Sequence, residues 1–200
     1  MSVRPQPRQM SYAEYREAEP TASSKHEYLH GEVFAVTGET PEHGALSARI
    51  IYLLTAALAD RACRVFSSDV RIRIEATDLT TGVATYPDAS VVCDTLRTAQ
   101  DDPHAITNPA MVVEVLSDST EGYDRGRKAS YYRRLPSLRA YLLVSQHEPR
   151  LELQLRREDG TWSLVEVGPG QSLSIEPLEI SLNVDDVYVD PLAPRASSKG

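Results

Sequence analysis

Residues 108–120 read NPAMVVEVLSDST, and this stretch indicates a strand in the interior of a β-sheet. Its centre, residues 111–116, is a near-continuous apolar run of the kind found in the middle of a sheet. The exception is Glu114, which has apolar neighbours on both sides. A carboxylate in this setting is costly to bury unless it is paired, hydrogen-bonded or bound to a metal. Glu114 is therefore a candidate functional residue, and a carboxylate that simply pairs with an arginine is the alternative.

Further strands flank this stretch in the sequence. DASVVC (88–93) is a second short β-branched run, and AYLLVS (140–145) is a third. The segment between the last two strands, residues 123–139, is predicted to be a helix. After residue 150, LELQLRR, TWSLVEV and SLSIEP alternate apolar and polar residues and are separated by Asp-Gly and Gly-Pro-Gly turns. This pattern indicates a C-terminal antiparallel meander.

The N-terminal half adds helices and strands in alternation. Ser11 and Glu14 form a capping-box pattern that starts a short helix, and residues 31–36 read as a turn followed by a strand. Apolar residues at helical spacing predict an amphipathic helix from residue 42 to about residue 62. Residues 70–74 alternate apolar residues with arginines, which predicts a strand with one buried face. The mixture predicts an α/β (α+β) fold, with a mixed β-sheet flanked by helices.

The overall composition is typical of one soluble domain. A chain of 200 residues with 41% hydrophobic residues can form one core and leaves little room for a second complete domain. We expect the domain at residues 11–190, between flexible tails at residues 1–10 and 191–200. Neither a membrane span nor a signal peptide is evident, so a cytoplasmic location with no membrane association is expected. Cys63 and Cys93 are expected to be small buried hydrophobic residues and not a disulfide.

The net charge of −8 counts against a nucleic-acid partner, because the field of an acidic protein repels phosphates. Residues 123–139 are a local exception, where six basic residues stand against one acid. Such a helix can face DNA phosphates on an otherwise acidic molecule, and a solvated helix face is the alternative. The candidate DNA-binding residues are Arg125, Arg127, Arg133 and Arg134.

Asp88 and Glu114 together suggest a hydrolytic metal site. Asp88 opens the predicted strand at residues 88–93. If the two strands are adjacent, both carboxylates lie on one side of the sheet and offer the oxygen ligands that suit Mg²⁺ or Mn²⁺. Phosphodiester hydrolysis also needs a cation near the charge that develops in the transition state. Lys128, four residues after Asp124 on the predicted helix, is the best candidate, and a plain surface Asp124–Lys128 pair is the alternative.

The ordered set of three motifs, YPDASVV (86–92), NPAMVVEVLSDST (108–120) and YDRGRKASYYRRL (123–135), resembles the Uma-type restriction endonuclease family of the PD-(D/E)XK nuclease superfamily. The resemblance runs from about residue 11 to residue 187. It implies a restriction-endonuclease-like twisted mixed sheet flanked by helices, Mg²⁺-dependent nuclease chemistry and a homodimer.

The resemblance also assigns site residues. Asp88 corresponds to the PD aspartate and Glu114 to the (D/E) position, and these two with Val115 are the expected metal ligands. The lysine that the superfamily pattern places in the strand is missing, because Leu116 occupies its position. The resemblance implies that Lys128 replaces this lysine from the following helix.

An N-terminal acid often completes the metal site in this superfamily. Glu27 corresponds to the family's glutamate before the first strand and is the preferred catalytic candidate, with Glu32 as the alternative. His43 could reach the cleft as a polar contact, although a lone histidine near a helix start is more often structural. Ser145 stands where relatives often have an aspartate, which is expected to affect only local hydrogen bonding.

These observations predict a metal-dependent endonuclease that hydrolyses DNA phosphodiester bonds with Mg²⁺ or Mn²⁺. A catalytically silent binding module with the nuclease fold is the main alternative, suggested by the acidic net charge and the missing strand lysine. The joint presence of Asp88, Glu114 and Lys128 argues against that alternative. A metal-dependent hydrolase of another phosphate ester would use the same carboxylates. The sequence shows no base-reading or stacking element, so it does not predict which DNA structure is preferred.

Overall fold

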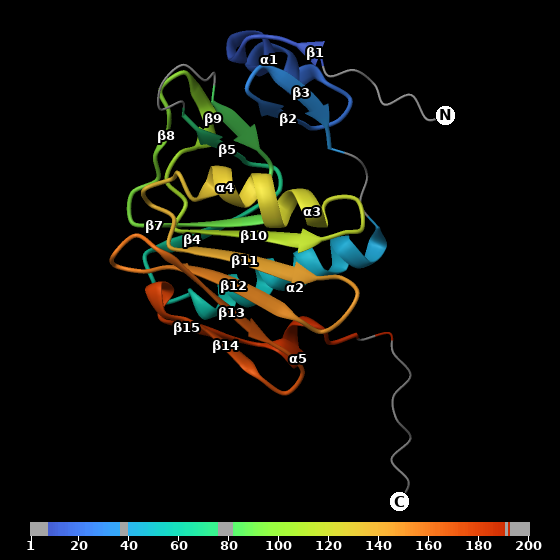
Figure 1. The fold of residues 1–200 in the computed structure, drawn as a ribbon, viewed down its shortest axis with the longest axis vertical. Coiled ribbons are helices and arrows are strands. Elements are labelled where there is room, and N and C mark those ends of the chain that lie inside the picture. The colour runs from blue at the N-terminus through green and yellow to red at the C-terminus, as the bar shows by residue number, and fades with distance from the viewer. Residues whose placement is uncertain (1–7, 37–39, 76–81, 191, 193–200) are drawn as a thin grey trace, which may run out of the picture.

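The strands of this protein form two mixed sheets and a separate hairpin (Figure 1). The computed structural model describes residues 8–36, 40–75, 82–190 and 192. Sheet A contains, in spatial order, β1 (Arg8–Gln9), β3 (Glu32–Ala35), β2 (His26–Leu29), β6 (Val83–Thr85), β5 (Arg71–Ile74), β9 (Asp102–Ile106) and β8 (Thr98–Ala99). Sheet B contains β13 (Trp162–Val167), β12 (Leu151–Arg156), β11 (Ala140–Ser145), β10 (Met111–Leu116), β7 (Ala89–Cys93) and β4 (Cys63–Ser67). The hairpin is formed by β14 (Ser172–Ile175) and β15 (Ile180–Asn183).

Helices cover both faces of sheet B (Figure 1). The helical elements are α1 (Tyr12–Ala18), α2 (Pro41–Ala57), α3 (Glu121–Tyr123), the π-helical turn η2 (Asp124–Lys128), α4 (Ala129–Tyr132) and α5 (Val184–Val187), with short 3₁₀ turns at Glu19–Thr21 and Glu176–Leu178. Helix α2, α5 and the β14–β15 hairpin pack on one face of sheet B. The continuous segment α3–η2–α4 packs on the other face and also contacts sheet A. Helix α1 packs against β2 and β6 of sheet A.

The alternation of side chains along β10 determines which residues reach the space between the two sheets. Strand β10 is parallel to β11 and antiparallel to β7, and each of its residues is buried. Met111, Val113 and Val115 belong to the core formed with α2. Val112 and Leu116 belong to the core formed with α4, so Glu114, which lies between them, faces the α3–η2–α4 segment.

The predicted fold class is confirmed: the protein has mixed sheets with helices on their faces. The apolar runs of β10 and β11 are central strands of sheet B, as their sequences indicated. The Ser11–Glu14 capping box is also present at the start of α1. Within the described residues, no helix has the length and apolar character needed to cross a membrane.

The expectation that β5 has one buried face was wrong, since all four of its residues are buried. The arginines of β5 lie under α1 and are stabilised there. Arg71 forms an ion pair with Asp102 at 3.0 Å, and the Arg73 guanidinium lies 3.6 Å from the ring centroid of Tyr12. The alternation of apolar residues and arginines therefore predicted the position of this strand correctly. It did not predict that the arginines are buried, because their partners lie in other segments of the chain.

Two further segments differ from their predicted arrangement. The antiparallel meander extends from β11 through β12 to β13, but β14 leaves sheet B and pairs with β15. Leu173 and Ile175 of β14 are thereby buried against α2 and α5. At the other end of the chain, Arg8 and Gln9, which the sequence assigned to the N-terminal tail, pair with β3.

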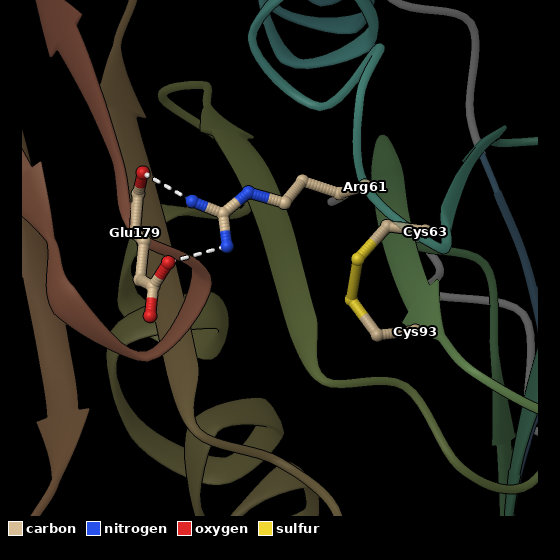
Figure 2. Close-up of a disulfide and its surroundings, with 4 residues drawn as sticks. All are labelled: Arg61, Cys63, Cys93 and Glu179. Carbon is tan, nitrogen blue, oxygen red and sulfur yellow. Dashed lines mark hydrogen bonds and ion pairs between the residues drawn. A yellow bond between two sulfur atoms is a disulfide. The ribbon is translucent and has the colours of Figure 1, made fainter.

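Cys63 and Cys93 form a disulfide, which corrects the expectation of two unlinked thiols (Figure 2). The two residues are direct partners in the antiparallel pairing of β4 with β7, and their Cα atoms are 4.0 Å apart. Their side chains are only partly buried at the rim of the α2 core. Close by, Arg61 forms an ion pair with Glu179 (Figure 2). The spacing of the two cysteines along the chain does not predict this pairing, because the register of β4 and β7 creates it.

Candidate active site

Glu114 is the buried centre of the candidate site. Its side chain faces the α3–η2–α4 segment, and only 3% of the residue is exposed. Two groups of that segment bind Oε1: the Lys128 ammonium at 2.9 Å and the Tyr132 hydroxyl, which donates at 2.9 Å. Thr85 in turn donates to the Tyr132 hydroxyl at 2.9 Å. Within the described residues, Glu114 Oε2 accepts no hydrogen bond.

Asp88 belongs to the site because β10 extends beyond the residues that pair with β7. The last paired residues are Val113 and Ala89, so Val115 has no backbone partner on that edge among the residues that the structure describes. Asp88, directly before β7, supplies one: its Oδ2 accepts from the Val115 N–H at 2.7 Å. His43 Nε2, from the first turn of α2, lies 3.3 Å from the same oxygen. The predicted convergence of Asp88 and Glu114 at one side of neighbouring strands is thus what the fold produces.

Lys128 enters the cluster from the helical segment. Its Nζ lies 2.9 Å from Glu114 Oε1, 3.1 Å from Glu27 Oε1 and 3.7 Å from Asp124 Oδ1. Lys128 and Asp124 are both buried, so the alternative of a surface Asp–Lys pair does not apply. The segment that carries them is a π-helical turn, a feature often found at functional sites.

Both carboxylate oxygens of Glu27 are occupied. Oε1 receives the Lys128 ammonium and the backbone N–H of Tyr86 at 3.3 Å, and Oε2 accepts from the Tyr123 hydroxyl at 3.2 Å. Glu32 lies elsewhere, where its Oε1 accepts from the Gln9 side chain at 3.4 Å. Of the two N-terminal acids considered from the sequence, Glu27 therefore lies in the cluster and Glu32 does not.

The cluster opens into a cavity of about 660 Å³. One wall is formed by β10, Asp88 and the α3–η2–α4 segment, and the opposite wall by β2 and β3. The residues that line it include Lys25, Glu27, Phe34, His43, Tyr86, Asp88, Glu114, Val115, Tyr123, Asp124, Arg127 and Lys128. The predicted acidic residues and the lysine thus share one cavity.

The charges in this cavity are strongly coupled. Burial raises the pKa of Glu114 against the opposing attraction of Lys128, and the carboxylates Asp124, Asp88 and Glu27 raise it further. Burial also raises the pKa of Asp124. For Lys128, burial disfavours the ammonium, but attraction to Glu114 and Glu27 outweighs it and raises the pKa. Within the described residues, the Lys128 ammonium contacts the carboxylates of Glu114, Glu27 and Asp124, and Asp88 lines the same cavity.

The four candidate DNA-binding arginines point in two directions. Arg125 forms ion pairs with Glu121 and Glu152, and Arg133 donates to Gln154, so both are directed toward β12. Arg127 lines the cavity, and Arg134 lies 5.4 Å from the ring centroid of Tyr131. The sequence placed all four on one helix without distinguishing these two groups.

Sequence reasoning missed Tyr132, Tyr123 and Thr85 as members of the site. Tyr132 could have been found, because it follows Lys128 by four residues and so shares its helical face. Tyr123 and Thr85 carried no such signal, since their contacts depend on how sheet A packs against the helical segment. His43, considered only as a possible cleft residue, contacts Asp88.

Comparisons with known proteins identify the family of this chain. A family model described as "Putative restriction endonuclease" (Uma2) matches residues 12–185. Two relatives come from Synechocystis sp. (strain ATCC 27184 / PCC 6803 / Kazusa). The uncharacterized protein slr1290 is 35% identical over 179 residues, covering 90% of this chain and 91% of the relative. The uncharacterized protein sll1609 is 32% identical over 167 residues, covering 84% and 92% respectively.

A solved structure supports the same assignment at the level of the fold. The crystal structure of "a putative nuclease belonging to DUF820" from Anabaena variabilis ATCC 29413 superimposes with a TM-score of 0.66. The match covers 84% of this chain and 91% of that chain, at 13% sequence identity. Since the family model spans most of the chain and the resemblance in the sequence is confirmed, this protein belongs to the Uma2 family of restriction-endonuclease-like proteins.

Proposed function

We propose that this protein is a metal-dependent endonuclease that hydrolyses DNA phosphodiester bonds. The observation that carries the proposal is which carboxylate oxygens in the cavity already have hydrogen-bond or ion-pair partners and which do not. Asp88 and Glu114 each use one oxygen for structural contacts and keep the other without a partner among the described residues. Glu27 uses both oxygens. Asp88 and Glu114 are therefore the residues that would hold a metal, and Glu27 holds Lys128.

The donor set fits Mg²⁺ or Mn²⁺. Within the described residues, no three His, Cys, Asp or Glu side chains form a ready-made metal cage. Mg²⁺ does not require one, because it is commonly held by one or two carboxylates and keeps several water molecules. Val115 adds a third donor: its N–H reaches Asp88, and the carbonyl of the same residue points to the same edge of the strand. The gathering of four acidic side chains in one cavity, Asp88, Glu114, Glu27 and Asp124, also favours a divalent cation, whose charge stabilises their ionised forms.

The bound metal would activate a water molecule and polarise the scissile phosphate. The residues of the chain supply the remaining requirements. Lys128 places a fixed positive charge beside the ligand Glu114, where it can orient the attacking water or offset charge that develops on the phosphate. Glu27 and Asp124 hold the ammonium in place, and Tyr132 fixes the Glu114 carboxylate through Oε1, so that Oε2 would be available to a metal.

The proposed partner is DNA, and the proposed assembly is a homodimer. A two-fold assembly allows a nuclease to address both strands of a duplex through equivalent sites. Light scattering tests the assembly, and a monomer at high micromolar concentration would remove the symmetric double-strand model.

The decisive experiment combines cleavage with metal binding. The parent is expected to cut plasmid and single-stranded DNA with Mg²⁺ or Mn²⁺ and not with EDTA. Asp88→Asn and Glu114→Gln should lose cleavage, and calorimetry should show weaker Mn²⁺ binding by both variants. Asp60→Asn is the matched control, because this exposed carboxylate lies beyond the end of α2. Parent-like Mn²⁺ binding by both site variants would refute the assignment, and a parent that binds metal without cutting would favour a silent binding module.

A further inference from the structure

Besides Glu27, one wall of the cavity carries apolar groups that the hydrolytic chemistry does not use. The hairpin of β2 and β3 and the residue after it contribute Leu29, Phe34, Ala35 and Val36 to this wall. A two-residue turn at His30 and Gly31 closes this hairpin, and both residues have positive φ angles, 53° and 97°. Such a turn matches the twist of the two strands and fixes their register.

The register places Phe34 beside Glu27. The two residues are direct partners in the antiparallel pairing of β2 with β3, so their side chains lie on the same face of sheet A. Glu27 reaches Lys128 from that face. Phe34 therefore stands on the face that looks toward the acidic cluster, and it remains 39% exposed. An aromatic ring exposed to a cavity, directly next to a buried ion-pair cluster, is available for a ligand.

The opposite wall offers groups suited to a phosphate. Arg127 lines the cavity and is exposed, and its guanidinium donates to the Tyr131 hydroxyl at 3.3 Å. Within the described residues, Arg127 forms no ion pair, unlike Arg125 on the same segment. The cavity thus has an aromatic ring on one side, and Arg127 with the proposed metal-binding acids Asp88 and Glu114 on the other. This arrangement matches a nucleotide, whose base could contact the ring while its phosphate lies near Arg127 and the acids.

The cavity has the size needed for a single nucleotide. A volume of about 660 Å³ lies within the range of small-ligand pockets, roughly 300–1,000 Å³. This volume is large enough for an individual nucleotide. A base inside a duplex is unavailable for such contact, whereas an unpaired base can be placed on an aromatic ring.

We propose that Phe34 is a stacking platform for an unpaired nucleobase, so that single-stranded or locally unpaired DNA is the preferred substrate. This inference rests on the proposed nuclease function and adds the substrate class to it. Base stacking on aromatic side chains is tolerant of sequence, because every base has a π face. The subsite therefore selects for unpaired structure and not for a base sequence.

Binding without cleavage tests the inference. The probes are a short oligothymidylate and an abasic oligomer of equal length, which carries the same charge without bases. Fluorescence anisotropy is measured at low salt in EDTA, so that no metal-dependent cutting occurs. The parent should prefer oligothymidylate. Phe34→Ala should weaken oligothymidylate binding by roughly 5- to 150-fold and leave binding of the abasic oligomer unchanged.

Two variants and one further measurement complete the test. Phe34→Tyr keeps a ring and should retain the preference of the parent. Tyr52→Ala removes an exposed aromatic residue of α2 that does not line the cavity, and it should behave like the parent. Light scattering should give the same mass for the parent and Phe34→Ala, and a change in mass would instead assign Phe34 to a contact between copies of the chain.

The outcomes separate this inference from the proposed function. The stacking platform is overturned if the parent binds neither oligomer, if it binds both equally, or if Phe34→Ala retains the preference. The nuclease proposal is decided separately by cleavage with Mn²⁺, which the EDTA measurements do not involve. A parent that cuts with Mn²⁺ but lacks the oligothymidylate preference would refute the platform alone.

Discussion

Lys128 Nζ lies 2.9 Å from Glu114 Oε1, so the cation of the cluster comes from the helical segment that follows β10. Leu116, at the strand position where the superfamily pattern has its lysine, instead packs in the core with α4. We therefore propose that Lys128 takes the place of this strand lysine. The catalytic role of Lys128 is open to a direct test.

Lys128→Met should abolish most cleavage, with a loss of roughly 100- to 1,000-fold, the range for removal of an electrostatic group at a reacting centre. It should also destabilise the fold by about 3–5 kcal/mol, since removing one partner of a buried ion pair leaves its carboxylates uncompensated. Mn²⁺ affinity should rise, because the competing ammonium is gone. Cleavage kinetics, urea unfolding and calorimetry provide the three measurements.

The combination of outcomes is what identifies the role of Lys128. A merely structural lysine would lower cleavage and Mn²⁺ affinity together. With the proposed role, saturating Mn²⁺ should restore stability to Lys128→Met by more than it stabilises the parent, since binding to the native state adds to its stability. Arg139→Met removes an exposed charge and should change neither the cleavage rate nor the stabilisation by Mn²⁺. Parent-like cleavage by Lys128→Met would refute the catalytic assignment.

Stability at acid pH should depend on Asp102, which lies outside the cavity. Burial opposes ionisation of Asp102, but hydrogen bonds from Tyr12 and the His104 N–H and the ion pair with Arg71 outweigh it and hold the pKa below its ordinary value. A lowered native pKa stabilises the fold above the unfolded pKa of about 3.9, and this contribution is lost as pH falls through the native value.

Asp102→Asn should therefore flatten the acid limb of a stability curve from urea unfolding. It should also cost about 3–5 kcal/mol at neutral pH, because Arg71 is left buried without its partner. Asp69→Asn is a matched control: the Asp69 pKa is also lowered, but its Lys25 partner lies at the surface and the pair is worth about 0–1 kcal/mol. Equal pH dependence of the two variants would contradict this account.

The parts of the site that the sequence predicted are those whose signal is local. Glu114 was visible because apolar residues surround it, and Asp88 because it opens a second apolar run. Lys128 was found by its helical spacing from Asp124 together with the family motif. For each of these residues, the neighbours in the sequence already indicate burial or orientation.

The remaining features depend on register and on contacts between distant segments. The Cys63–Cys93 disulfide follows from the pairing of β4 with β7, and the exposure of Phe34 from the packing of the β2–β3 hairpin. Arg125 is held by Glu152 of β12, a strand whose position the helix sequence does not reveal. The periodic pattern of apolar residues in one segment cannot identify such partners, because they lie many residues away along the chain.

The disulfide can be tested by counting thiols. Denatured protein that has not been reduced should show no free thiol, and reduction should lower stability by about 2–4 kcal/mol, as is typical when a cross-link closes a loop. Cys63→Ser with Cys93→Ser should show the same loss and no further effect of reductant. Mn²⁺ binding should be retained, because Cys93 lies at the opposite end of β7 from Asp88. Two free thiols in the native protein would exclude the cross-link.

The two groups of arginines should differ in their effect on DNA binding. Arg127 and Arg134 are exposed and have no carboxylate partner among the described residues, so they are free to contact phosphates. The double variant Arg127→Ala, Arg134→Ala should lower the slope of log K against log salt by about 0.9 for each duplex phosphate contact that is lost. Affinity measured over a range of salt concentrations gives this slope.

Arg125→Ala with Arg133→Ala is the matched comparison, since it removes the same charge from the same segment. Its salt slope should stay near that of the parent, because Arg125 is already neutralised by Glu121 and Glu152 and Arg133 is directed toward Gln154. Its cost should instead appear as lower stability, since Glu152 is buried and loses its bidentate partner. If both double variants lower the slope equally, the whole helical segment faces DNA. If neither does, these arginines serve solubility and the phosphate contacts lie elsewhere.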